Sequence, residues 1–338
     1  FPHQMPQHIC QTILKYHLEI PSWPQLPNRS PLENMYTQYS ERLPALVFNE
    51  EKQNIYFDTS QDIYAALEEF YGHYLESDVE YFRMSSDYAQ GFYSFREEIQ
   101  KSPLNGVKFL KGQITGPISF GLTITDENKR AILYHDELFD AVMKNCIMKV
   151  KWQIKMLQKL HPAVIIMIDE PYLSAFGSGY ISLSREQVVG HIGAIVETIK
   201  EEGATPGIHC CGNTDWSIVI DTGTQILNFD ADSYFQGITL YPEKLGEFLH
   251  QEGILAWGII PTTDKIGAVK LEDILSDFDT KLTQLVRKGF TSTALLQRSI
   301  ITPSCGLGTH EEVNSEKAIQ LAALVAAALR EKYLAHGS

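Results

Sequence analysis

The sequence predicts an α/β fold, a single (β/α)8 barrel of the TIM type that spans residues 1–338 as one domain. Short runs of β-branched and other apolar residues recur along the chain and end in glycine or proline, which is typical of buried parallel strands. Helical patterns separate these runs, and strands that alternate with helices form parallel sheets. No linker divides the pattern, so a barrel is favoured over an open doubly wound sheet, which is the alternative.

The predicted strands begin after an irregular, proline-rich first third. A first strand is predicted at 80–86 (EYFRMSS). Six clearer segments follow, each a buried apolar run with a glycine or proline at its end. They are 107–117, 163–171, 205–212, 225–231, 254–261 and 298–306.

Helices are predicted between these strands from apolar residues at three- and four-residue steps. In 136–160 the stripe is Phe139, Met143, Cys146, Val150, Ile154 and Leu157, and lysines lie outside it. Segments 185–202 and 271–288 follow the same pattern. Ser315 is expected to cap a last helix that runs to about residue 334.

Composition excludes several classes of function. A net charge of −14 argues against nucleic-acid binding, which needs a basic surface. Five cysteines without regular spacing are a poor disulfide framework and favour a reducing, cytoplasmic location. The longest apolar stretch, 321–329, is shorter than the ~20 residues that cross a bilayer, and no secretory signal is visible, so no membrane role is expected.

The unusual polar residues stand where the predicted strands end. In a barrel, chemistry gathers at the carboxyl ends of the strands, so their convergence there predicts an enzyme. These residues are Asp169, Glu170, His209, Cys211, Asp230 and Cys305.

Two of them form half of a possible zinc site. Side chains alternate along a strand, so His209 and Cys211 point the same way and Cys210 points the other way. Cys305 ends a strand that faces theirs across the barrel mouth. Three nitrogen and sulfur ligands with one replaceable position are typical of catalytic zinc. Asp230 is the best carboxylate for that position, and Asp232 is a weaker candidate.

The alternative is that these cysteines belong to the core, because free cysteine is among the most buried residue types. This interpretation is preferred for Cys10, Cys146 and Cys210. It is less favoured for Cys211 and Cys305, which lie beside glycines at strand ends.

Four segments carry a family resemblance. The segments 209–216 (HCCGNTDW), 301–312 (ITPSCGLGTHEE), 111–117 (KGQITGP) and 168–171 (IDEP) resemble the cobalamin-independent methionine synthase superfamily. That superfamily also contains corrinoid-dependent coenzyme M methyltransferases and uroporphyrinogen decarboxylase. Its fold is an eight-stranded α/β barrel.

The resemblance implies roles for individual residues. It assigns zinc to His209, Cys211 and Cys305, and it matches the family's fourth ligand, a glutamate, best to Asp230. It assigns Asp169 to the amino group of homocysteine. The segment 78–82 (DVEYF) resembles one with a homocysteine-binding glutamate, which makes Glu80 a further candidate.

The implied activity is zinc-dependent methylation of homocysteine to methionine. Two departures from the family bear on it. The family barrel opens with a strand that ends Gly-Ser-x-Pro-His or similar, whereas this sequence begins FPH, so the first strand is expected to be missing. The length leaves no room for the second barrel of the large synthases, so the expected methyl donor is a methylcorrinoid or a corrinoid protein rather than folate.

Three other functions stay open at this point. One is corrinoid-linked methyl transfer to coenzyme M or another thiol. Another is a uroporphyrinogen decarboxylase-like reaction, although the early arginines it would use are limited to Arg29 and Arg42. The third is a barrel that only binds metal or docks a corrinoid protein.

Overall fold

A six-stranded parallel sheet forms the centre of the protein. The computed structural model describes residues 1–16, 19–60, 62–101, 104–178 and 181–334. The strands of the sheet are β3 (Leu110–Thr115), β4 (Val164–Asp169), β5 (Thr205–Cys210), β6 (Ile226–Asp230), β7 (Ile254–Ile260) and β8 (Ser299–Pro303). All six lie inside the segments that the sequence predicted.

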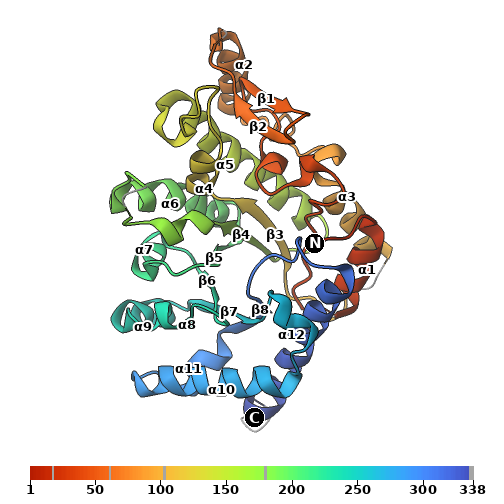
Figure 1. Ribbon diagram of the computed structural model, residues 1–338, viewed down its shortest axis with the longest axis vertical. Helices are drawn as coiled ribbons and strands as arrows, with labels where there is room; N and C mark the ends of the chain where they lie inside the picture. Colours follow the sequence, from red (N-terminus) through yellow and green to blue (C-terminus); the bar gives the residue numbers. More distant parts are fainter. Residues whose placement is uncertain (17–18, 61, 102–103, 179–180, 335–338) are drawn as a thin grey trace.

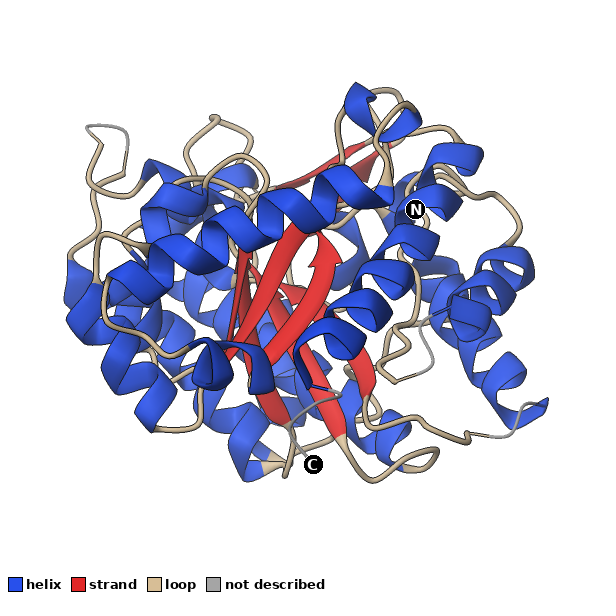
Figure 2. Cartoon of the chain, turned by 90° about the horizontal axis from the view of Figure 1, so that it is seen from below, coloured by secondary structure: helices blue, strands red, loops and turns tan. Residues whose placement is uncertain are grey.

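The order of the strands decides between the two sheet architectures. Each strand pairs in parallel with the next strand along the chain, from β3 to β8. In an open doubly wound sheet the order reverses at a switch point, and no such reversal occurs among the described strands. The sheet curls as a barrel wall does, and helices surround its outer face (Figures 1 and 2).

The helices after β3 lie around the curled sheet (Figure 1), and the last of them also lines the cavity described below. They are α4 (Pro117–Thr123), α5 (Asp136–Gln158), α6 (Arg185–Glu201), α7 (Trp216–Asp221), α8 (Phe235–Ile238), α9 (Pro242–His250), α10 (Leu271–Arg287), α11 (Ser292–Gln297) and α12 (Glu312–Leu334). Short 3₁₀ helices occupy Pro31–Glu33, Thr37–Tyr39, Ile132–Tyr134, Pro171–Ala175 and Asp264–Gly267. None of the described helices is long and apolar enough to cross a lipid bilayer.

The last helix begins earlier than the sequence predicted. The backbone N–H of Ser315 donates to the carbonyl of Glu311 at 3.0 Å, so the helical hydrogen bonds already start there. Ser315 is buried inside the first turn of α12 and is not its cap.

The first third of the chain is more regular than its composition indicated. It contains α1 (Pro6–Tyr16), a hairpin of β1 (Leu46–Asn49) and β2 (Asn54–Phe57), α2 (Tyr64–Leu75) and α3 (Ser86–Lys101).

The strand predicted at 80–86 is wrong, because this segment is the turn between α2 and α3. Its apolar side chains are buried without a sheet. Phe82 packs edge-on against Phe70 of α2, with ring centroids 5.2 Å apart. The carboxylate of Asp78 accepts the N–H of Tyr81 at 3.2 Å and holds the turn.

The sheet has an open edge. Beside β3, the segment 19–23 adds a short parallel pairing, in which Lys111 N donates to Pro21 O at 3.0 Å and Trp23 N donates to Lys111 O at 3.3 Å. At the other end, β8 pairs only with β7 among the described residues, and all its residues are half-buried. The described strands therefore form most of a barrel wall but do not close it into eight strands.

Inward-facing side chains, which alternate with outward-facing ones along each strand, form two zones inside the curled sheet. Ile165, Met167, Ile226 and Ala256 form an apolar cluster that also contacts Ile300, on the inner face of the wall. Further toward the carboxyl ends, the same alternation brings polar residues inward. A cavity of about 760 Å³ reaches from this polar zone to the open edge beside β8.

Candidate metal centre

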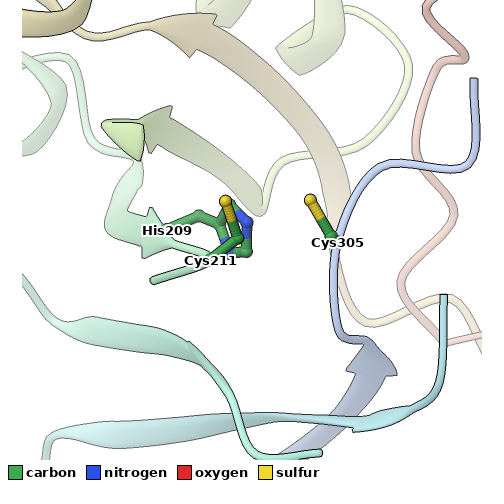
Figure 3. Close-up of side chains that lie close together, drawn as sticks. All are labelled: His209, Cys211 and Cys305. Atoms are coloured by element: carbon green, nitrogen blue, oxygen red, sulfur yellow. The ribbon is translucent and has the colours of Figure 1, made fainter. Parts of the chain in front are cut away.

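Three sulfur and nitrogen donors meet at the carboxyl end of the sheet. They belong to His209 on β5, to Cys211 directly after it, and to Cys305 in the loop that follows β8. One ligand atom from each lies within 4.8 Å of the others, and Figure 3 shows both sulfurs and the imidazole gathered in one place.

The curvature of the sheet makes this meeting possible. Strands β5 and β8 are separated by β6 and β7. Neighbouring strands lie about 4.8 Å apart, so strands three positions apart in a flat sheet would be about 14 Å from each other. The curl brings the ends of β5 and β8 across the mouth of the wall, as the sequence predicted for facing strands.

Cys210 lies on the opposite face from its two neighbours. It is fully buried in the hydrophobic core between the sheet and the helices, and its thiol donates to the carbonyl of Gly212 at 3.7 Å. His209 and Cys211 line the cavity instead. The predicted alternation is confirmed, and so is the core interpretation of Cys10 and Cys146, which are also buried.

The three donors influence one another's pKa values. Interactions with the Cys211 thiol and with His209 lower the pKa of Cys305 to about 4. The neighbouring Cys305 thiolate, together with burial, raises the pKa of Cys211. Burial disfavours the charged form of His209, yet Cys305 and Asp169 outweigh it and raise its pKa. A thiolate stabilised in this way is the form of cysteine that binds metals.

The donor set fits a zinc-type ion. The Nδ1 atom of His209 is buried and has no hydrogen-bond partner within the described part of the chain, and either ring nitrogen of a histidine can bind zinc. Zinc holds sulfur at about 2.3 Å and nitrogen at about 2.0 Å, which places neighbouring ligands about 3.3–3.8 Å apart. The observed spread of the three atoms, within 4.8 Å, requires only small movements to reach that geometry.

Asp230 does not join the three donors, although it lies at the predicted strand end. Its carboxylate is buried and accepts the backbone N–H of Ser233 at 2.8 Å, which fixes the turn after β6. Neither Asp230 nor Asp232 belongs to the cluster found among the described residues, or lines the cavity. The fourth position of a tetrahedral ion would therefore face the cavity, as in a catalytic site.

Asp169 stands beside the cluster. It is the register partner of His209 across β4 and β5, and His209 is in turn the partner of Asn228 on β6. All three side chains line the cavity. Burial raises the pKa of Asp169, while the positive charges of His209 and Lys111 oppose that effect. A cationic group of a ligand would stabilise this carboxylate further.

Lys111 is a site residue that sequence reasoning missed. It lies on β3, lines the cavity, and donates to the Gln113 side chain at 3.2 Å. Burial lowers its pKa, and the charge of Asp169 acts in the opposite direction. The same alternation that placed His209 would have placed Lys111 and Gln113 inward, because they are two apart on a predicted strand.

Glu170, next to Asp169, has a structural role. Its carboxylate accepts the backbone N–H groups of Ile118 and Ser119 at 2.9 and 2.8 Å, at the first turn of α4. Burial raises its pKa to about 7, against these hydrogen bonds. Glu170 ties the end of β4 to the start of α4 and so holds Asp169 in place.

Gly116 makes room for this carboxylate. A Cβ at this position would lie 2.1 Å from Oε1 of Glu170. We expect Gly116→Ala to lower the free energy of unfolding by about 2–3 kcal/mol, because Glu170 must move and lose hydrogen bonds to buried N–H groups. Urea unfolding measures this. Gly72→Ala is the control, since no atom lies within 4 Å of its added Cβ, and equal stability of the two variants would contradict the packing argument.

Glu80 is not part of the site. It lies in the turn between α2 and α3, its side chain is 61% exposed, and it pairs with Arg83 at 3.4 Å. It does not line the cavity, so the structure gives no support to a substrate-binding role for this residue.

The fold and the donor set together describe a curled α/β sheet with a histidine and two cysteines at its strand ends. Comparison with known proteins agrees at the level of the fold. No protein-family model matches the sequence. No curated protein matches it either.

Solved structures do match. The chain is similar to a B12-independent methionine synthase from Shewanella sp. W3-18-1 in complex with selenomethionine, with a TM-score of 0.59 and 13% identity over 98% of this chain and 89% of that one. It is also similar to a methyltransferase from Methanosarcina mazei, with a TM-score of 0.56 and 14% identity over 99% of this chain and 87% of that one. These similarities establish a shared fold, as the resemblance of the four sequence segments predicted.

Proposed function

We propose that the protein is a zinc-dependent methyltransferase that methylates the thiol of homocysteine to give methionine. The observation that carries this proposal is the cluster of His209, Cys211 and Cys305, which opens on a cavity with a half-buried carboxylate and a half-buried amine. The shared fold with a methionine synthase and a methyltransferase supports it.

The ligand set suits thiol activation. A free thiol, with a pKa of about 8.5, is only a few per cent ionised at neutral pH. A zinc ion bound there would act as a Lewis acid that deprotonates the substrate thiol. The two cysteinate side chains reduce the net positive charge of the site, which leaves the substrate sulfur nucleophilic. His209 supplies the neutral ligand.

Asp169 and Lys111 fit the two charged groups of an amino acid. In this proposal the Asp169 carboxylate binds the ammonium group of homocysteine, and the Lys111 amine binds its carboxylate. Both residues line the same cavity as the cluster, and the charge of each acts on the pKa of the other. The volume of about 760 Å³ lies in the range of small-molecule sites and leaves space for part of a donor.

A methylcorrinoid, free or carried by a corrinoid protein, is the methyl donor that we propose. The net charge of −14 disfavours long-range attraction of a folate with an anionic polyglutamate tail. A corrinoid would approach the open mouth of the wall face-on and present its methyl group to the substrate sulfur.

The test is an incubation of the zinc-loaded protein with homocysteine and each donor, with methionine measured by mass spectrometry. We expect methionine from methylcobalamin, more from a methylated corrinoid protein, and little from methyltetrahydrofolate with one or several glutamates. Cys305→Ser is the matched inactive control. Turnover with folate and none with any corrinoid would overturn the choice of donor, and no turnover with either would overturn the function.

A second candidate is methyl transfer to another thiol, such as coenzyme M. Lys111 favours it, because this amine could bind a sulfonate as well as a carboxylate, and one structural neighbour is described only as a methyltransferase. Asp169 disfavours it, because coenzyme M has no ammonium group. A uroporphyrinogen decarboxylase-like reaction is less compatible with this cavity. Among the described residues, Lys111 and Arg330 are the lysine and the arginine that line it, and Arg330 already pairs with Glu19 at 2.8 Å.

A further inference from the structure

A second group of metal-ligand residues lies between the first and the last helix. It consists of His3, just before α1, His8 in α1, and Glu316 in α12. One donor atom from each lies within 4.8 Å of the others. Helices α1 and α12 contact each other and lie side by side in Figure 1, so residues from opposite ends of the sequence meet here.

His3 Nε2 makes a long hydrogen bond to Oε1 of Glu316, and the spacing of the three donors also matches that of ligands around one ion. The Nε2 atoms of His3 and His8 approach the same oxygen of Glu316 at 3.3 and 3.5 Å. Both are longer than the usual N–H···O hydrogen bond of about 2.9–3.0 Å. Ligands held at about 2.0–2.1 Å by one tetrahedral ion are separated by about 3.3 Å, which matches the observed spacing.

The orientation of the two rings agrees with this geometry. Their centroids are 5.6 Å apart and their planes are inclined by 73°. Two imidazoles that bind one tetrahedral ion through Nε2 would have centroids about 5 Å apart. The rings therefore converge on a common point next to Glu316 and do not stack.

Burial gives a reason for an ion at this place. His3 is completely buried, and its Nδ1 atom has no hydrogen-bond partner among the described residues. Burial disfavours a charged imidazole, and the neutral ring is the form that binds a metal ion through Nε2. The side chains of His8 and Glu316 are 53% and 35% exposed, so an ion could enter from solvent. Glu312, one turn earlier on α12, is placed on the same helix face for a fourth ligand.

We propose that His3, His8 and Glu316 bind a divalent transition-metal ion such as zinc or cobalt. The ion would join the two rims of the open edge of the sheet, because α1 leads into the segment beside β3 and α12 follows β8. Its role is to hold these rims together, and it is separate from the chemistry at the cysteines.

The experiment removes the cysteine centre first. The metal-free double variant Cys211→Ser/Cys305→Ser is titrated with Co²⁺ and with Zn²⁺, and bound metal is measured by equilibrium dialysis. We expect one equivalent to bind, without the charge-transfer absorption of a thiolate–cobalt bond. Adding His8→Ala or Glu316→Gln should weaken this binding at least tenfold. Both residues are partly exposed, so these changes leave the core intact, and circular dichroism checks the fold.

His250→Ala in the same double variant is the matched control, because His250 is an exposed histidine outside the group. It should bind metal like its parent. A parallel thermal melt should show that metal raises Tm in the parent and in the His250 control, but not in the His8 or Glu316 variants. The proposal is overturned if the double variant binds no metal, or if His8→Ala and Glu316→Gln leave binding unchanged. Either result leaves the proposed methyltransferase function untouched, because the cysteine centre is absent from every variant.

Discussion

Cys305→Ser is expected to weaken zinc binding at the candidate metal centre by a hundredfold or more and to abolish methyl transfer. Structural zinc sites with four ligands bind with about 10–16 kcal/mol, so one ligand contributes on the order of 3 kcal/mol, which is roughly a hundredfold in affinity. The serine hydroxyl stays protonated at neutral pH and cannot replace the thiolate that its neighbours stabilise at Cys305.

His209→Ala and Cys211→Ser should behave in the same way, whereas Cys210→Ser should retain the metal. Cys210 has the same neighbours in sequence but is buried on the other face of β5. Cobalt substitution is the best measurement, because thiolate–cobalt absorption reports this centre even if other ions bind elsewhere. Equal loss of that absorption in Cys210→Ser would contradict the assignment of Cys210 to the outer face of β5. Full retention of the absorption in all four variants would show that these residues do not form a metal centre.

Asp169→Asn is expected to lower kcat/KM for homocysteine by about a hundredfold, mainly through KM, with zinc content unchanged. A partly buried carboxylate that pairs with an ammonium contributes on the order of 3 kcal/mol when its partner is lost, and 1.4 kcal/mol corresponds to tenfold. The amide of asparagine keeps the size of the side chain but carries no charge. Steady-state kinetics with methylcobalamin as donor measures the effect.

Two comparisons make this test specific. 4-Sulfanylbutanoate is homocysteine without its amino group, and its turnover should be similar in the wild type and in Asp169→Asn. Asp230→Asn is the matched protein control, because Asp230 is a buried aspartate at the end of β6, two strands from β4, and does not line the cavity. If Asp169→Asn leaves homocysteine kinetics unchanged, Asp169 has only a structural role at the end of β4.

The sheet and its main helices were predictable because their signals are local. The runs around β3 to β7 are mostly buried on both faces, and the stripe of α5 repeats every three or four residues. The cluster of His209, Cys211 and Cys305 followed from alternation within a strand and from the rule that parallel strands end at one edge. The segment 80–86 misled because aromatic burial against α2 resembles the pattern of a strand.

The features that were not predictable depend on contacts between distant parts of the chain. Whether Asp230 turns toward the cluster or toward Ser233 is decided by a turn after β6, and no spacing in the sequence reports it. The depth of Lys111 in the cavity depends on how the curled wall and the segment 19–23 enclose it. Glu80 was matched through a motif, and the exposed position of its turn became visible only in three dimensions.

The separation of the donors along the chain has a consequence for biosynthesis. A polypeptide emerges from the ribosome with its N-terminal part first. Once β5 and the residue after it have been made, two of the three donors are present, His209 and Cys211. The third donor, Cys305, follows much later in the chain, after β8. If the proposed centre binds zinc, tight binding must wait until Cys305 has been made and the wall has curled. Zinc would then be loaded together with completion of the cavity, which His209, Cys211 and Cys305 line.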